Sequence, residues 1–159
     1  MENKFIKPNK IICMEFNIKI GSKNERRIKV DHNQTTSFLW EGENVFSTPS
    51  MISEMEETCR LLLKEQFLGV DSDWDSVGTI VDVNHIAATP VGAEILLKAE
   101  VINSDGRKVS FQVSAEDSLE LIGDGKHERF IINVPRFKEK FDQKVKRLSD
   151  FKNSKSARS

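Results

Sequence analysis

The sequence has no tyrosine, only two cysteines and no long apolar run. Cys13 and Cys59 each fall in an apolar pattern and lack the CxxC or Cys/His spacing of a metal site, so we expect buried free thiols, as in a reducing cytoplasm. A membrane span needs about 20 consecutive apolar residues. Lys4, Lys7 and Lys10 interrupt the N-terminal segment, and we therefore expect a cytoplasmic protein with no membrane partner.

An excess of one charge sign is also absent, since 24 Lys and Arg oppose 25 Asp and Glu, for a formal net charge of -1. This balance gives no electrostatic reason to expect a nucleic-acid partner. The three histidines, His32, His85 and His127, share no recognisable metal-ligand spacing, so no metal is expected.

At 159 residues the chain predicts one domain. We assign residues 1–10 to a flexible N-terminus, 11–137 to the folded domain and 138–159 to a C-terminal helix with a basic, solvated tail. Apolar and polar residues alternate from Met14 to Ile20, which predicts a half-buried strand, and Arg26 to Val30 predict a short second strand.

A helix is predicted from Thr48 to about Phe67. Thr48 suits the N-cap and Pro49 the first helical position, and Gly69 suits the end of the helix. The helical period places one apolar stripe on this segment, made of Ile52, Met55, Cys59, Leu62 and Leu63. Among the acidic residues of the helix, Glu56 lies nearest to that stripe, about 70° from its centre, so we expect it to face partly inward.

The residues after the helix alternate as antiparallel strands. Asp105-Gly106 predicts a tight hairpin, and a final strand is expected from about Lys126 to Val134. One long helix beside such strands predicts an α+β fold in which an antiparallel sheet wraps around the helix. Because one helix cannot cover both faces and both edges of the sheet, we expect a homodimer.

Several short motifs follow one another between Val45 and Phe137. They are Phe46-Ser47-Thr48-Pro49, Met55-Glu56, Val77-Gly78-Thr79, His85-Ile86-Ala87-Ala88-Thr89-Pro90-Val91-Gly92, Asp105-Gly106-Arg107, and Ile122-Gly123 followed by Gly125-Lys126-His127-Glu128-Arg129. In their order and spacing the chain resembles the hotdog-fold thioesterases typified by fluoroacetyl-CoA thioesterase. The resemblance implies a hotdog fold, hydrolysis of an acyl-CoA thioester and active sites at a homodimer interface, with CoA as part of the substrate and no separate cofactor.

By this resemblance, Thr48, Glu56 and His85 are the catalytic trio. Gly78 matches a glycine whose backbone helps to hold the thioester, and Arg129 matches an arginine at the substrate site. Whether Glu56 activates water as a base or attacks as a nucleophile through an anhydride is left open by the sequence.

Two aromatic residues near the start of the helix, Trp40 and Phe46, are expected to contact the substrate. The fluoroacetyl-specific member carries an aromatic lid residue at a position that corresponds to Gly42 or a close neighbour here. A short-chain acyl-CoA other than fluoroacetyl-CoA is therefore the expected substrate.

Each of these residues also has a purely structural interpretation. A histidine titrates near neutrality and serves as acid or base, but His85 on an apolar strand face is also compatible with a satisfied core residue. Thr48 is explained as a helix cap alone, and Glu56 as an ion-pair partner of Arg60 one turn away. Arg129 is compatible with a surface charge that balances nearby acids.

Two alternative functions remain at this point. One is a hotdog protein that binds acyl-CoA or a related ligand without turnover. The other is a hotdog dehydratase or hydratase, whose histidine and carboxylate occur in a different motif that this sequence lacks. His127 is interpreted as structural or exposed.

Overall fold

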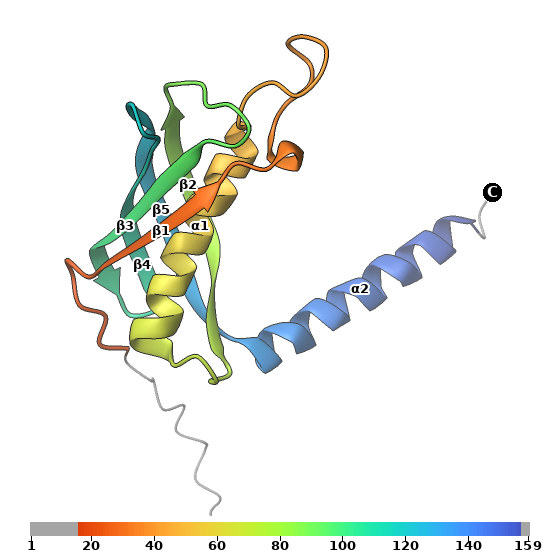
Figure 1. Ribbon diagram of the computed structural model, residues 1–159. Coiled ribbons are helices and arrows are strands. Elements are labelled where there is room, and N and C mark those ends of the chain that lie inside the picture. Colours follow the sequence, from red (N-terminus) through yellow and green to blue (C-terminus); the bar gives the residue numbers. More distant parts are fainter. Residues whose placement is uncertain (1–15, 157–159) are drawn as a thin grey trace, which may run out of the picture.

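The computed structural model describes residues 16–156 and shows one antiparallel sheet curved around one helix (Figure 1). The five strands lie in the order β1-β3-β4-β5-β2. Their bounds are β1 Lys23–Lys29, β2 Trp74–His85, β3 Glu94–Asp105, β4 Lys108–Glu116 and β5 Leu121–Asn133. The central helix is α1, Thr48–Leu63, which continues into a π-helical turn, Lys64–Leu68, and a second helix, α2, spans Val134–Ser156. The predicted α+β hotdog architecture is confirmed.

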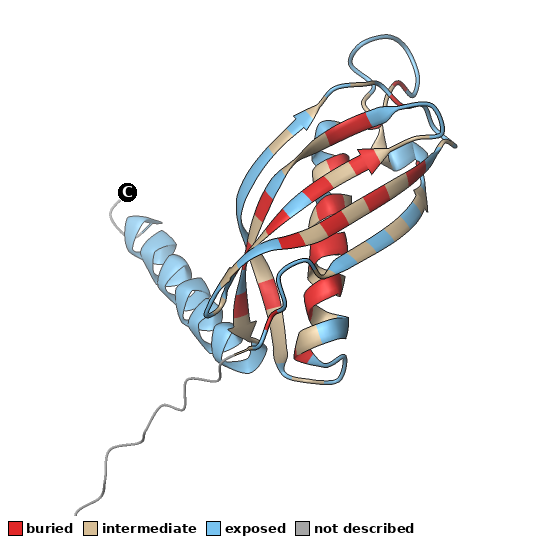
Figure 2. Ribbon diagram, turned by 90° about the vertical axis from the view of Figure 1, so that its left-hand side faces the viewer, coloured by how far each residue is buried: buried red, intermediate tan, exposed pale blue. Residues whose placement is uncertain are grey.

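The core lies between α1 and the concave face of the sheet (Figure 2). From α1 it receives Met51, Met55, Thr58, Cys59, Leu62 and Leu63. Alternate residues of β3 and β4, such as Leu97, Val101 and Phe111, pack against them. The predicted stripe was one residue out at its start, because Met51 is buried and Ile52 only half-buried. Cys59 is a buried free thiol as expected, and burial raises its pKa to about 12; Cys13 lies outside the described residues.

The first predicted strand is wrong within the described part of the chain. Residues 16–20 have no strand partner, and the chain forms β1 only after the turn at Gly21, which has a φ of 87°. Phe16 and Ile18 are nevertheless anchored by packing, since Phe16 meets the ring of Trp74 edge-on at 5.0 Å and Ile18 is buried. The alternating pattern here reflects the burial of apolar side chains, but the backbone of residues 16–20 forms no hydrogen-bonded pairing with a neighbouring strand.

The start of α1 differs from the prediction in a way that matters for the site. The N-cap is Ser47, whose hydroxyl accepts a hydrogen bond from the Ser50 N–H at 3.2 Å. Thr48 is the first helical residue, so its hydroxyl is free for another partner. The end of the helix is as predicted, because Gly69 follows with a φ of 83°.

The predicted hairpin joins β3 to β4, with Asp105 paired to Lys108 across Gly106 and Arg107. The last strand begins earlier than expected, at Leu121, so Gly123-Asp124-Gly125 lies inside β5. Gly125 allows β2 to approach closely, since a Cβ there would lie 2.2 Å from the Asp82 carbonyl oxygen.

Two parts of the structure, the edge strand β2 and the helix α2, are only partly covered by the other described elements. β2 is an edge strand, and its residues Ile80 and Val81 are 54% and 44% exposed. α2 leaves the sheet directly after β5, is exposed along its whole length and projects away from the domain (Figures 1 and 2). None of the helices formed by residues 16–156 is long and apolar enough to cross a membrane.

Candidate active site

The first half of the candidate site is a pair formed by Thr48 and His85. The Thr48 Oγ1 and the His85 Nδ1 are 2.8 Å apart, which joins the first turn of α1 to the last residue of β2. The other ring nitrogen, Nε2, is buried and has no hydrogen-bond partner within residues 16–156. A buried imidazole nitrogen without a partner is unusual, because such groups are normally satisfied. The His85 Nε2 is therefore available for a hydrogen bond with a bound ligand.

The second half of the site surrounds Glu56, two turns further along α1. Its Oε1 lies 3.8 Å from Arg129 Nη1 and 3.5 Å from His127 Nε2, both on β5. Arg129 is held in place by Ser76 of β2, since its Nε donates to the Ser76 hydroxyl at 2.8 Å and its Nη2 to the Ser76 carbonyl oxygen at 2.7 Å. The interpretation of Arg129 as a surface charge is wrong, because the residue is only 5% exposed.

His127 is fixed in one neutral form by its two contacts. Its Nδ1 lies 2.8 Å from the Ile80 carbonyl oxygen, which only accepts, so Nδ1 carries the proton. Its Nε2 then accepts from Arg129 Nη1 at 3.2 Å. Burial lowers the pKa of His127, and the Arg129 charge acts in the same direction. Burial likewise lowers the pKa of Arg129, although the nearby Glu56 carboxylate opposes this.

The Glu56 carboxylate packs directly against Gly78 of β2. A Cβ at this position would lie 2.2 Å from Glu56 Oε1 and 3.1 Å from His127 Cε1, so only glycine lets the carboxylate rest on the strand. The pairing of β2 with β5 is irregular between Gly78 and Ile80, which is a bulge of the kind often found beside active sites.

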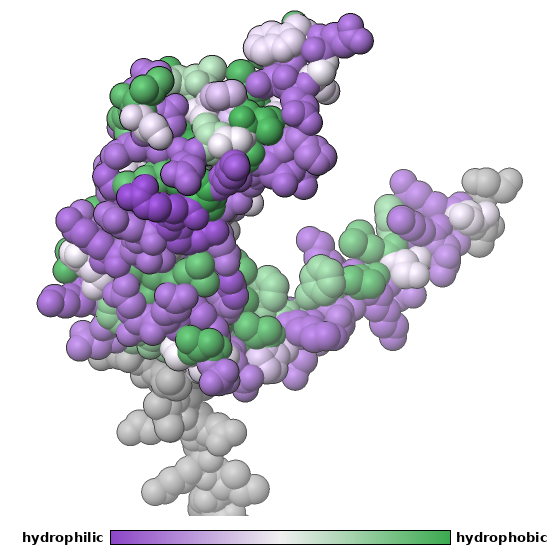
Figure 3. All heavy atoms as spheres, viewed as in Figure 1, coloured by the Kyte–Doolittle hydropathy of each residue, from purple (hydrophilic) through white to green (hydrophobic). Residues whose placement is uncertain are grey.

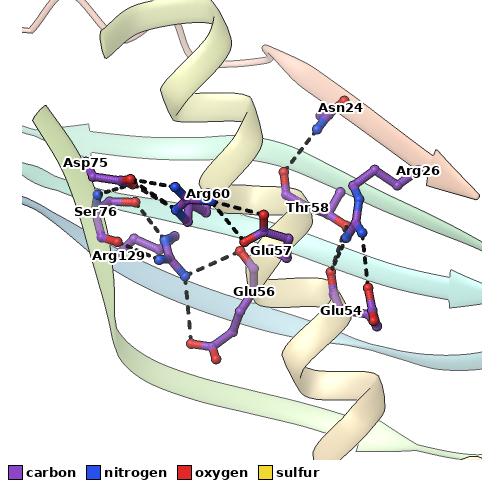
Figure 4. A network of polar contacts seen from close by, with 10 residues as sticks. All are labelled: Asn24, Arg26, Glu54, Glu56, Glu57, Thr58, Arg60, Asp75, Ser76 and Arg129. Atoms are coloured by element: carbon purple, nitrogen blue, oxygen red, sulfur yellow. Dashed lines mark hydrogen bonds and ion pairs between the residues drawn. The ribbon is translucent and has the colours of Figure 1, made fainter. Parts of the chain in front are cut away.

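The acidic residues of α1 divide among three arginines (Figure 4). Glu54 pairs with Arg26 of β1 at 3.1 Å, and Glu57 pairs with Arg60 at 3.0 Å. Arg60 also binds Asp75 at 2.7 Å. The structural interpretation of Glu56 as a partner of Arg60 is therefore wrong. The Glu56 carboxylate points instead toward Arg129, on the inward side expected from the helical period.

Two separate cavities adjoin these groups. One, of about 290 Å³, is lined by Thr48 and His85 together with Phe38 and Phe46. The other, of about 540 Å³, is lined by Glu56, Gly78, Arg129 and their neighbours and shares no lining residue with the first. Because eight residues of helix span about 12 Å, the trio does not meet within one chain. Thr48 and His85 come together, and Glu56 stands apart.

The two aromatic residues expected at the substrate have different positions. Phe46 is fully buried and lines the smaller cavity. Trp40 is 57% exposed, at the tip of a loop, and does not line either cavity; Phe38 of the same loop does. Asn44 shapes this loop, since its side chain accepts from the Leu39 N–H at 3.0 Å and donates to the Trp40 carbonyl oxygen at 3.1 Å.

His127, interpreted from the sequence as structural or exposed, is buried, and its ring lies beside Glu56 and Arg129. Its distance of two positions from Arg129 put both on one face of a strand, and that signal was available. No group of three potential metal ligands occurs among residues 16–156. The side chains gathered at the two cavities include a hydroxyl, two imidazoles, a carboxylate and a guanidinium, which can act as acids, bases and hydrogen-bond partners.

A five-stranded antiparallel sheet curved around one long helix is the hotdog fold. The model of the fluoroacetyl-CoA-specific thioesterase family matches residues 30–135. The fluoroacetyl-CoA thioesterase of Streptantibioticus cattleyicolor is 31% identical over 139 residues, covering 83% of this chain and 98% of that protein. The chain belongs to this family and is a thioester hydrolase.

Solved structures agree with this assignment. A structure of fluoroacetyl-CoA thioesterase superposes with a TM-score of 0.72 at 31% identity, covering 80% of this chain and 97% of that one. A thioesterase-superfamily member from Thermus thermophilus, at 23% identity, shares the fold with a TM-score of 0.74, covering 84% of this chain and 97% of its own.

Proposed function

We propose that this protein is a cytoplasmic homodimer that hydrolyses short-chain acyl-CoA thioesters to the free acid and CoA, with Thr48, Glu56 and His85 as the catalytic residues. Glu56 either takes a proton from a water molecule whose oxygen attacks the thioester carbonyl, or attacks that carbonyl itself and forms an anhydride that water then hydrolyses to the free acid. The C–S bond of the tetrahedral intermediate then breaks, and His85 gives a proton to the leaving thiolate. The Gly78 backbone N–H stabilises the oxyanion.

The observation that carries this proposal is the position of Glu56. Its carboxylate rests on Gly78 at the edge of a cavity and is held beside Arg129, whose guanidinium is fixed by Ser76. A carboxylate needed only for stability would gain little from a half-exposed position over a glycine. A carboxylate that must approach a carbonyl carbon needs this open side and a fixed orientation.

A dimer through β2 would unite the two halves of the site. If β2 pairs antiparallel with β2 of a second, two-fold-related copy, the His85 end of one strand meets the Ser76–Gly78 end of the other. The exposed Ile80 and Val81 lie between these ends and would pair across the two-fold axis. Each active site would then combine Glu56 of one copy with Thr48 and His85 of the other.

The smaller cavity favours a short acyl group. At about 290 Å³ it is lined by apolar side chains such as Phe38, Phe46 and Ile86 beside the Thr48–His85 pair. An apolar cavity of about 150 Å³ holds a benzene ring, so this space limits the acyl group to about ten carbon atoms. Fluoroacetyl-CoA is the substrate that gives the Streptantibioticus cattleyicolor relative its name, and the acyl group preferred here is to be ranked by experiment.

The test is the release of free thiol from a panel of acyl-CoAs of increasing chain length, with Glu56→Gln measured alongside. We expect the variant to lose at least about 100-fold in kcat/KM, the scale of a lost acid–base group. Glu57→Gln is the matched control, because Glu57 lies on the same helix and pairs with Arg60 instead. Equal turnover in Glu56→Gln and wild type would refute the site. Binding of CoA without thiol release would favour the non-catalytic alternative.

A further inference from the structure

The surface that the proposed reaction does not use is α2, most of which lies beyond residue 135, where the family match ends. One face of α2 is apolar, and its large side chains are 45–59% exposed: Phe137, Phe141, Val145, Leu148 and Phe151. In proteins most of the stability of a helix comes from the packing of its apolar face on other elements. A 23-residue helix with such a stripe is expected to pack on another surface. Its own domain adjoins only its first turns, near Phe137 and Lys140.

The opposite end of the domain exposes a second set of apolar side chains. This loop end comprises residues 31–47, 86–93 and 117–120, the connections around the last residue of β2. Its most exposed apolar members are Leu119 at 91%, Phe38 at 81%, Ile86 at 58% and Trp40 at 57%. Single exposed apolar residues are ordinary, but a cluster on neighbouring loops indicates an interaction surface.

Charge matches these two surfaces to each other. α2 carries eight Lys and Arg against three Asp and Glu. The loop end carries five acidic residues and no Lys or Arg: Asp31, Glu41, Glu43, Asp117 and Glu120. Two copies of α2 would repel one another, whereas α2 and the loop end attract.

Geometry brings the two surfaces together between copies of the chain. α2 begins at the first residues of β2, since the Val134 N–H donates to the Asp73 carbonyl oxygen at 2.8 Å. The loop end lies at the last residue of β2. In the antiparallel β2 pairing proposed above, the start of β2 in one copy meets the end of β2 in the other. In Figures 1 and 3, α2 and the loop around Trp40 project on the same side of the domain and leave a hollow between them.

We propose that α2 is a dimerisation arm, whose apolar stripe packs on the loop end of a second copy against Phe38, Leu39 and Trp40. Its length of about 34 Å is enough to cross that end. By two-fold symmetry, α2 of each copy packs on the loop end of the other copy. Because Phe38 also lines the cavity of Thr48 and His85, the arm of one chain holds the loop over the active site of its partner. The inference rests on the proposed dimer and not on the proposed reaction.

The first test compares two full-length variants with the same change in charge. Phe141→Glu with Leu148→Glu alters the stripe, and Gln143→Glu with Asn153→Glu alters the opposite face of α2. We expect the dimer dissociation constant from analytical ultracentrifugation to rise at least about 10-fold in the stripe variant and to stay unchanged in the control. Equal constants in the two variants, or a monomeric wild-type protein, would overturn the proposal.

The second test follows the loop end directly. The chain has two tryptophans and no tyrosine, so Trp74→Phe leaves Trp40 as the only fluorophore of this kind. Its emission should be blue-shifted in the dimer and should shift to the red when the stripe substitutions are added. Unchanged emission would overturn the packing on Trp40. Binding of α2 to phosphatidylserine vesicles through the stripe, with no effect on the dimer, would assign the helix to a membrane surface instead. The readouts do not use turnover, so a protein without thioesterase activity can still support this inference.

Discussion

Gly78 shows how a single missing side chain positions a reacting group. An added Cβ would meet Glu56 Oε1 at 2.2 Å, and the flexible glutamate would have to swing away. We expect Gly78→Ala to lower kcat/KM by about 10- to 100-fold, because a displacement near 1 Å is enough for such a loss. The melting temperature should change little, since alanine suits an extended strand. Thr79→Ala, one position along the same strand, is the control and should keep its activity.

His127 makes stability depend on pH. Burial, aided by Arg129, lowers its pKa in the folded protein, whereas in the unfolded chain a histidine titrates near 6.5. Protons therefore bind the unfolded chain more readily. The stability linked to neutral His127 is present above about pH 6.5 and is lost progressively as the pH falls from there toward the lower pKa of the folded protein.

We expect the melting temperature to fall between about pH 7.5 and about pH 5 and to fall less in His127→Gln, which keeps an amide in place of the ring but does not titrate. Thermal scans across this range measure the difference between the two curves. Other groups titrate alike in both proteins, so the difference reports His127. Parallel curves would contradict the neutral, buried state of this histidine.

Much of the candidate site could be predicted from the sequence, but only within the limits of local patterns. The helical period correctly turned Glu56 inward, because that period is a property of the helix itself. Local patterns do not report which loops a fold brings together. The contact between Thr48 and His85 joins residues 37 positions apart, and it depends on Ser47 taking the capping role.

At the scale of elements, Ser47 and Thr48 divide two tasks at the start of α1. Ser47 caps the helix and Thr48 pairs with His85. We expect Ser47→Ala to cost about 1 kcal/mol of stability and to reduce activity only slightly. Thr48→Val should show the reverse, with stability nearly unchanged and kcat/KM reduced. Denaturant unfolding measures the stability of both variants, and thiol release measures their activity. If both variants lost stability and activity to the same extent, the capping role of Ser47 and the pairing role of Thr48 would not be separate.

The strands show where sequence patterns succeed and fail. Alternation predicts β3 and β4 well, because each faces the core on one side and solvent on the other. The same alternation in residues 16–20 reported only that Phe16 is partly buried and Ile18 is buried. Forming a strand also requires backbone hydrogen bonds to a neighbouring strand, and the alternation of side chains does not report whether those bonds form.

At the scale of the whole molecule, the distance between Glu56 and the Thr48–His85 pair becomes a prediction about subunits. Glu56→Gln and His85→Ala should each be inactive when pure. If each site takes Glu56 from one copy and His85 from the other, a heterodimer of the two variants has one site with both substitutions and one site with neither.

Unfolding the two variants together and refolding them at equal concentrations should therefore restore activity. Random pairing makes half of the dimers heterodimers, each with one intact site of two, so about one quarter of wild-type turnover is expected. Each variant refolded alone is the control and should stay inactive. A mixture that also stays inactive, although mass spectrometry shows that heterodimers have formed, would mean that each site takes its trio from one chain. Glu56 and His85 would then have to approach one another within one subunit, which requires a movement of α1 against β2. Pairing of β2 between two subunits needs no such movement.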